Sequence, residues 1–240
     1  MGKFINPGIV VSVANQKGGV GKSVITSIIA NYIHNNYKSK IKEIVADSDD
    51  FQSSLYGIRQ RELETAGEKE KEKLYRLVQI SSSDIPEQIG VLQEEYDIVF
   101  IDLPGNLKQP GVITAFHFVD VVIAPTQSSP LDIDSTLKFH NLYNEIIDYR
   151  KKLGVSTDFH ALFSRVDPQN KDFKTLYENK EDLQIKFLDN YVPESKVAFQ
   201  RNVSTVNSYE NKKYDDYREL CEEILTIILT YAQNEKRIQQ

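Results

Sequence analysis

Cysteine is almost absent from this chain, and its scarcity excludes several classes of protein. The 240 residues include one cysteine, Cys221, one methionine and no tryptophan. A single cysteine can form neither an internal disulfide nor a Cys-x-x-Cys metal site. It also cannot supply the set of thiolates that holds an iron–sulfur cluster, which excludes the iron-protein reductases.

Long apolar runs and an excess of positive charge are lacking as well. No run of about 18 apolar residues occurs, so the sequence predicts no membrane span. The first ten residues lack the apolar core of a secretory signal, and Asn6 stands where a myristoylation signal needs serine or threonine. We therefore expect a cytoplasmic protein. The net charge of −6 argues against a protein that coats DNA by bulk charge, but it is compatible with a local basic patch.

What the chain does have is an alternation of apolar and amphipathic segments. This pattern predicts one α/β domain over residues 1–240, with a mostly parallel twisted sheet covered by helices on both faces. The charged stretch 59–73, interrupted at Gly67, is interpreted as a solvated helical excursion. The expected strands lie at residues 8–14, 42–49, 74–80, 96–105, 120–126, 159–167 and 185–193, and the expected helices at 23–37, 85–94, 132–153 and 215–233.

A glycine-rich loop, VANQKGGVGKS, joins the first expected strand to the first expected helix. It nearly fits the phosphate-binding pattern G-x-x-x-x-G-K-[ST], but Gln16 replaces the first glycine and a second lysine, Lys17, follows it. Glycines let the backbone N–H groups turn toward one point at the positive end of the helix, which makes an anion site suited to a polyphosphate. Lys22 is expected to bridge the terminal phosphates, and the Ser23 hydroxyl to ligate Mg²⁺.

Acidic residues end two other expected strands. Asp102 follows four apolar residues, at the position where P-loop proteins usually anchor Mg²⁺. Asp47, Asp49 and Asp50 end the strand at 42–49, and three neighbouring acids repel one another unless a cation lies near them. Ligands in open α/β sheets bind beyond the carboxyl ends of the strands. The sequence therefore predicts a nucleotide and magnesium site at this end of the sheet.

Four motifs, in the same order and with similar spacing, resemble those of the ParA/MinD family of P-loop ATPases. KGGVGKS resembles the deviant Walker A motif of that family, with its extra lysine at the loop entrance. ADSDDFQSS resembles the second motif, D-x-D-P-Q, and VFIDLPG resembles the Walker B strand. NYVPESKVAFQR is more loosely similar to the late I-P-x-x-x motif beside the adenine. The resemblance covers residues from about 10 to 201.

The resemblance implies a role for each matching position. Lys17 would reach the nucleotide of a partner subunit, and Asp49 would position the attacking water. Asp47 and Asp102 would lie around the metal with Ser23, and Pro193 would line the adenine pocket. The nucleotide, ATP, would be bound by the loop residues Gly18, Gly19, Val20, Gly21, Lys22, Ser23 and Val24.

The sequence departs from the family pattern at several of these positions. Asp50 replaces the proline of the second motif and Phe51 precedes Gln52, so either Asp49 or Asp50 aligns with the water-positioning acid. Ser164 stands where many relatives have an asparagine that reads adenine, which leaves the base preference open. Glu194 replaces a frequent arginine and removes one expected basic contact.

Within the family, the resemblance favours a slow ATPase for plasmid or chromosome partition. Such a protein forms a homodimer when ATP is bound, binds DNA nonspecifically, associates with the nucleoid in that state, and hydrolyses ATP when a ParB-like activator binds. Because the net charge is negative, DNA contacts would have to come from clustered basic residues. The candidates are Lys171, Lys174, Lys196, Arg201, Lys212 and Lys213.

Two alternatives on the same scaffold remain. A membrane-cycling positioning ATPase would need a basic amphipathic C-terminal helix, whereas the final residues AQNEKRIQQ offer only Ile238 to an apolar face. A metabolic enzyme that uses ATP to activate a carboxylate, like dethiobiotin synthetase, is the other alternative. ATPase activity measured with and without DNA would separate it from a partition ATPase.

Overall fold

The computed structural model describes residues 4–49, 54–194, 205 and 217–237. Within them, seven strands form one sheet in the order β3-β2-β4-β1-β5-β6-β7, with every neighbouring pair parallel. This confirms the predicted α/β class and its parallel sheet. The strands are β1 (Ile9–Val13), β2 (Glu43–Asp47), β3 (Arg76–Gln79), β4 (Ile98–Asp102), β5 (Val121–Thr126), β6 (Asp158–Val166) and β7 (Val192–Pro193).

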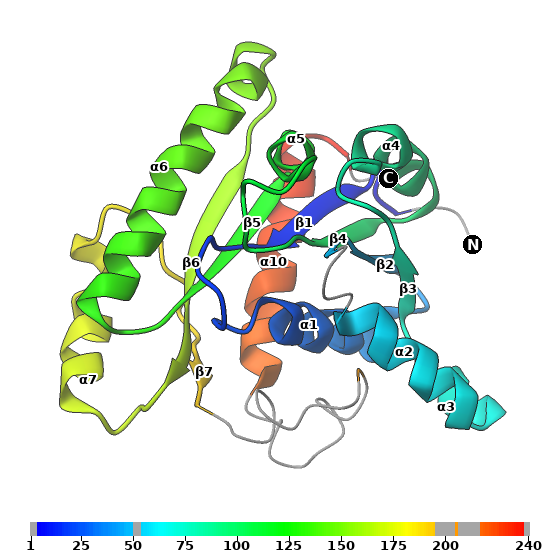
Figure 1. The fold of residues 1–240 in the computed structure, drawn as a ribbon, viewed down its shortest axis with the longest axis horizontal. Helices are drawn as coiled ribbons and strands as arrows, with labels where there is room; N and C mark the ends of the chain where they lie inside the picture. Colours follow the sequence, from blue (N-terminus) through cyan, green and yellow to red (C-terminus); the bar gives the residue numbers. More distant parts are fainter. Residues whose placement is uncertain (1–3, 50–53, 195–204, 206–216, 238–240) are drawn as a thin grey trace.

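Helices cover both faces of the sheet (Figure 1). The chain steps from β1 to β2 to β3 toward one edge with α1 and α2 on one face, and it returns through β4, β5 and β6 with α4, α5 and α6 on the other. A reversal of direction requires this change of face, because crossovers between parallel strands are right-handed. The helices are α1 (Lys22–Tyr37), α2 (Ser54–Thr65), α3 (Glu68–Lys71), α4 (Ile85–Glu95), α5 (Val112–Phe116), α6 (Pro130–Lys152), α7 (Lys171–Glu178) and α10 (Arg218–Asn234).

Alternate residues of the central strand β1 supply the two main cores. Ile9, Val11 and Val13 pack with α1 and α10 on one face, while Val10 packs with α4, α5 and α6 on the other. All of these side chains are fully buried. Burial on both faces explains why β1 is a continuous β-branched run rather than an alternating one.

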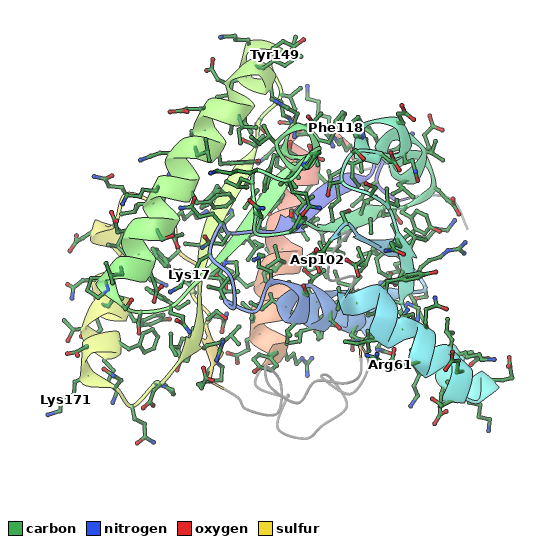
Figure 2. All side chains as sticks on the ribbon, viewed as in Figure 1. Lys17, Arg61, Asp102, Phe118, Tyr149 and Lys171 are labelled. Carbon is green, nitrogen blue, oxygen red and sulfur yellow. The ribbon has the colours of Figure 1, made fainter. Side chains whose placement is uncertain are left out.

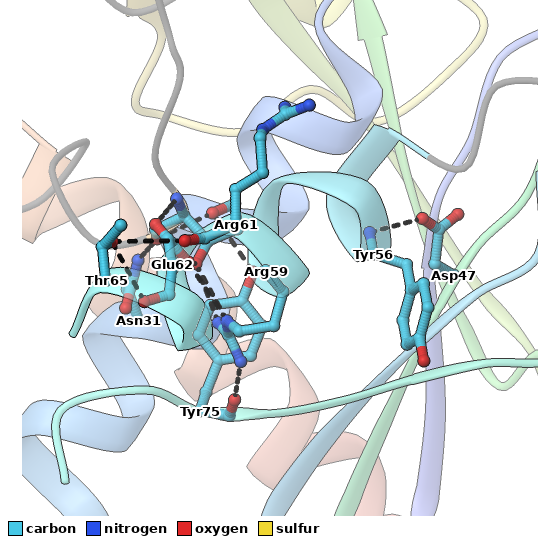
Figure 3. A network of polar contacts seen from close by, with 10 residues as sticks. Asn31, Asp47, Tyr56, Arg59, Arg61, Glu62, Thr65 and Tyr75 are labelled. Carbon is cyan, nitrogen blue, oxygen red and sulfur yellow. Dashed lines mark hydrogen bonds and ion pairs between the residues drawn. The ribbon is translucent and has the colours of Figure 1, made fainter. Parts of the chain in front are cut away.

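The charged stretch at 59–73 is helical, as predicted, and α2 and α3 project from the body of the fold (Figure 1). Gly67 separates the two helices and its N–H donates to Glu70 Oε2 at 2.8 Å. The prediction that the whole stretch 59–73 is solvated was wrong for Arg59, which is only 4% exposed. The guanidinium of Arg59 stacks 4.4 Å from the centre of the Tyr75 ring and donates to the Tyr75 carbonyl (Figure 3).

The predicted strand at 185–193 is wrong for most of its length. Only an isolated bridge between Phe187 and Ala161 and the short β7 pair with β6. The reason lies in competing side chains. The carboxylate of Glu223 in α10 accepts the N–H groups of Asp189 and Asn190, at 2.6 and 2.9 Å, so these backbone donors are not available to a strand ladder. The structure also contains two helices, α5 and α7, that were not among those expected from the sequence.

Candidate functional site

The glycine-rich loop connects the carboxyl end of β1 to the first turn of α1, as the sequence predicted. Gly19 and Gly21 have φ angles of +75° and +92°, which residues other than glycine rarely adopt. Gly21 is the N-cap residue of α1, and the helix begins at Lys22. The loop therefore lies at the positive end of the helix dipole, where backbone N–H groups favour an anion.

A cavity of about 780 Å³ lies against this loop. One wall is the loop with the start of α1, and the opposite wall is the segment 102–109 that follows β4. Asp49 completes the lining beside the end of β2. The residues that line it are Gln16, Gly18, Gly19, Gly21, Lys22, Ser23, Val24, Asp49, Asp102, Leu103, Pro104, Gly105, Asn106, Leu107, Lys108 and Gln109.

Lys22 places an ammonium group inside this cavity. Its Nζ donates to the Lys17 carbonyl at 3.2 Å, and a Cβ built at Gly105 would lie 2.9 Å from it. Glycine at position 105 thus allows the segment after β4 to approach the lysine. Burial lowers the pKa of Lys22, and the nearby carboxylates of Asp102 and Asp49 oppose that shift. An added polyphosphate would further favour the charged form, since an opposite charge at short range stabilises the ammonium.

Asp47 and Asp102 lie side by side at the carboxyl ends of β2 and β4, where the strand register pairs them directly. Both are buried, at 0% and 2% exposed. Asp47 accepts hydrogen bonds from the N–H groups of Tyr56, at 2.9 Å (Figure 3), and Asp49, at 3.3 Å. Burial raises the pKa of Asp47, and it raises the pKa of Asp102 to about 7, with the neighbouring Asp47 adding to the shift and Ser23 and Lys22 opposing it.

The carboxylate of Asp102 fits a magnesium site. Neither of its oxygens has a hydrogen-bond partner of ordinary geometry among the described residues, although both are buried. Such a group is costly unless a cation or a proton compensates it. Ser23 and Asp102 line the same cavity. Within the described part of the chain, no three His, Cys, Asp or Glu side chains form a metal-binding group by themselves.

The remaining predicted residues lie at different distances from the cavity. Asp49 lines it and is partly buried, whereas the alternative acid, Asp50, falls outside the described residues. Val24 lines it, but Val20 is buried and is not part of the lining. Pro193 is half-buried in β7, paired with Val166, and is not part of the lining.

Lys17 does not point into the cavity of its own chain. Its ammonium forms an ion pair with Asp132 near the start of α6, and its side chain is 39% exposed. The Asp132 carboxylate is 5% exposed and also accepts from the Ser129 hydroxyl at 2.6 Å. Figure 2 shows Lys17 between α1 and α6, while Asp102 lies over α1.

Three further residues near the cavity were not singled out from the sequence. Lys108 lines its far wall and is exposed, Asp132 pairs with Lys17, and Arg165 donates to the Gly19 carbonyl at 2.7 Å. Lys108 could have been found from the sequence, because it follows Asp102, the predicted end of a strand, by only six residues. Asp132 and Arg165 gave no comparable signal, because their contacts join segments more than 100 residues apart.

Solved structures of other proteins share the fold of this chain. A Borrelia burgdorferi protein described as a plasmid partition protein, and bound to AMPPNP, is 22% identical over 93% of this chain and 99% of its own, with a TM-score of 0.61. The Aquifex aeolicus MinD cell division protein is 15% identical over 91% of this chain and 97% of its own, with a TM-score of 0.63. A ParA family ATPase from Chlorobium tepidum is 12% identical over 90% of this chain and 99% of its own, with a TM-score of 0.60.

The chain has the ParA/MinD fold. No protein-family model and no curated protein matches the sequence, so the likeness is one of structure at low identity. None of the helices in the described ranges combines the length and the apolar character that crossing a bilayer requires.

Proposed function

We propose that this protein is a slow, dimerising ATPase of the ParA/MinD type, formed by residues 1–240 as one domain and acting in plasmid or chromosome partition. One observation supports the proposal most strongly: the glycine loop, Lys22 and the buried Asp102 line one cavity, and the strand register places the buried Asp47 beside Asp102. The shared fold supports the same conclusion. The substrate is ATP, which is hydrolysed to ADP and phosphate with Mg²⁺.

In this proposal each residue of the site has a role that follows from its chemistry. Backbone N–H groups of Gly18 to Ser23 bind the phosphates, and Lys22 neutralises their charge. Ser23 and Asp102 hold Mg²⁺, with Asp47 beside them. The ion offsets charge on the phosphates. Asp49, or Asp50 if the register is shifted, orients the attacking water, and Pro193 contacts the base.

Lys17 acts in a dimer. Each bound ATP carries about four negative charges, so two facing loops would repel each other unless cations lay between them. A lysine donated across the interface offsets this repulsion and stabilises the phosphoryl transition state, as an arginine finger does in trans. The contact with Asp132 therefore has to be exchanged for the partner's nucleotide when two ATP-bound chains meet.

DNA binding follows dimerisation in this proposal. The candidate contacts Lys171 and Lys174 are exposed on α7, and the other four, Lys196, Arg201, Lys212 and Lys213, lie outside the described residues. Phosphate contacts carry no sequence information, so the binding is nonspecific. A ParB-like DNA-binding protein would stimulate hydrolysis and release the dimer, and the ATP-bound form would associate with the nucleoid in the cytoplasm.

The test is ATP hydrolysis with Mg²⁺, measured with and without DNA, together with retention on unrelated DNA sequences at increasing salt. We expect slow hydrolysis, DNA retention that requires ATP, and a steep loss of retention with salt because counterions compete for the phosphates. Hydrolysis without any ATP-dependent DNA retention at low salt would favour the carboxylate-activating enzyme. No binding of ATP at all would exclude both functions.

A further inference from the structure

Two side chains at the end of β6 contact the outer side of the phosphate loop. The buried Ser164 hydroxyl donates to the Val20 carbonyl at 3.0 Å, and Nη1 of Arg165 donates to the Gly19 carbonyl at 2.7 Å. Neither Ser164 nor Arg165 belongs to the cavity lining, whereas Gly19 and Gly21 do. Two successive carbonyls of the loop are thus held by side chains that lie outside the cavity lining.

Because each peptide unit is planar, a hydrogen bond to a carbonyl also orients the N–H group of the next residue. In a trans peptide, the carbonyl and the N–H of the next residue point in opposite directions. A donor on the Gly19 carbonyl therefore turns the Val20 N–H away from Arg165, and a donor on the Val20 carbonyl does the same for the Gly21 N–H. Both N–H groups are thus turned away from β6, and Gly21 belongs to the lining of the cavity where the phosphates are proposed to bind.

Arg165 is itself held in an unusual conformation. Its φ angle is +57°, a left-handed value that residues other than glycine seldom adopt, and such values persist where the surroundings determine them. Glu194, directly after β7, holds the guanidinium with two contacts, Nε to Oε2 and Nη2 to Oε1, both at 3.1 Å. The Glu194 N–H donates in turn to the Val166 carbonyl at 2.8 Å. The planar fork of arginine suits this two-point contact.

We propose that Arg165 is a positioning residue that presets the anion-binding N–H groups of Val20 and Gly21, and that Glu194 keeps Arg165 in place for this task. The identity of the anion as the phosphates of ATP rests on the proposed function. The presetting itself does not depend on it, because the contacts are made by this chain alone. Glu194, which departs from the family pattern in sequence, thereby acquires a role.

The experiment has one arm that needs no nucleotide. Hydrogen exchange of the loop amides is measured in the nucleotide-free protein for wild type, Arg165→Gln, Arg165→Lys and Glu194→Gln. The control is Arg61→Gln, an exposed arginine on α2 away from the loop (Figure 2). We expect exchange about tenfold faster at residues 18–23 in Arg165→Gln, with β6 and the control unchanged, since one charged hydrogen bond is lost. Arg165→Lys should recover part of the protection.

The second arm measures the affinity for AMPPNP with Mg²⁺ by calorimetry. Arg165→Gln should bind about tenfold more weakly, and Glu194→Gln less weakly than that. The double variant should be no weaker than Arg165→Gln, because Glu194 acts through Arg165. Unchanged loop exchange in Arg165→Gln, with the melting temperature retained, would overturn the inference. If the wild type fails to bind AMPPNP, the proposed function fails, and the exchange arm still decides the role of Arg165.

Discussion

At the residue scale, the site depends on Asp102, whose buried carboxylate oxygens have no hydrogen-bond partner of ordinary geometry in the part of the chain that the structure describes. Asp102 has a pKa of about 7, against 3.8 for an unburied aspartate, chiefly because burial disfavours its charged form. The folded protein thus binds this proton more tightly than the unfolded chain. The contribution of Asp102 to stability is fully present below pH 3.8 and is lost as the pH rises through about 7.

The first prediction concerns Asp102→Asn. Without nucleotide or metal, this variant should melt at a higher temperature than wild type at pH 8, because it removes a buried charge that costs a few kcal/mol. At pH 4.5 the difference in melting temperature should be much smaller, since the wild-type carboxyl is then protonated in the fold and most of the stability difference develops between pH 4.5 and about 7. Thermal denaturation from pH 4.5 to 8.5 measures this. If the stability of the wild type instead rises across that range relative to the variant, the pKa of Asp102 is not raised in the folded protein.

The same variant should also lose ATP hydrolysis, since it removes a proposed metal ligand.

The second prediction decides between Asp49 and Asp50. A carboxylate that orients water is not needed to bind ATP, so Asp49→Ala should bind ATP normally and accumulate as an ATP-bound dimer with little hydrolysis. Asp50→Ala serves as the matched control and should hydrolyse ATP like wild type. Light scattering with ATP and a phosphate-release assay measure both. If the two variants exchange these behaviours, the second motif is shifted by one residue.

At the scale of elements, α2 connects the site to a residue far along the chain. Its N-terminal end donates from the Tyr56 N–H to Asp47 (Figure 3), and one turn later Arg59 and Glu62 hold Thr205. Thr205 is fully buried, and its N–H donates to Glu62 Oε1 at 2.6 Å while its hydroxyl accepts from Arg59 Nη2 at 2.8 Å. Two segments more than 140 residues apart in sequence are thus fixed to each other.

The third prediction tests that connection with Thr205→Val. The substitution keeps the shape of the side chain but removes the hydroxyl from the buried pair Arg59 and Glu62, so it should lower the free energy of unfolding by about 1–3 kcal/mol. The control is Thr65→Val, which removes an exposed hydroxyl at the end of α2 and should change the free energy of unfolding by less than about 0.5 kcal/mol. Urea denaturation measures both. Equal effects would show that the Thr205 hydroxyl contributes nothing beyond a surface threonine.

At the scale of the whole molecule, the contact between Lys17 and Asp132 would oppose formation of the proposed dimer. A lysine that is neutralised within its own chain is less available to a facing nucleotide. The proposed dimer would therefore have to bring more attraction than the lost ion pair supplied, and in the proposal bound ATP is the source of that attraction. Nucleotide binding would then be a condition for dimerising.

The fourth prediction compares Lys17→Ala with Asp132→Asn. Lys17→Ala should bind ATP as a monomer but fail to dimerise, and Asp132→Asn should dimerise at a lower concentration of AMPPNP because its lysine is released. Light scattering across an AMPPNP titration measures both. A full dimer population in Lys17→Ala would leave the second lysine of the loop without a role. An Asp132→Asn variant that dimerises less readily than wild type would show that the contact favours the dimer.

The sequence by itself determined the local chemistry. The strand, the glycine loop, the helix that follows and the acidic strand ends could be predicted because each depends on neighbouring residues, whose spacing fixes a turn, a cap or a buried face. Burial on both faces likewise made the parallel sheet recognisable, and the order β3-β2-β4-β1-β5-β6-β7 then brought Asp47 beside Asp102.

Only the tertiary structure decided which distant partners these groups meet. Lys17 turns to Asp132, Arg165 to Gly19, and the backbone of Asp189 to Glu223, which ended the strand that was predicted at 185–193. Each of these contacts replaces a locally plausible alternative, such as a solvated lysine or a continued strand ladder. The choice depends on which elements pack side by side, and local sequence spacing does not encode that proximity.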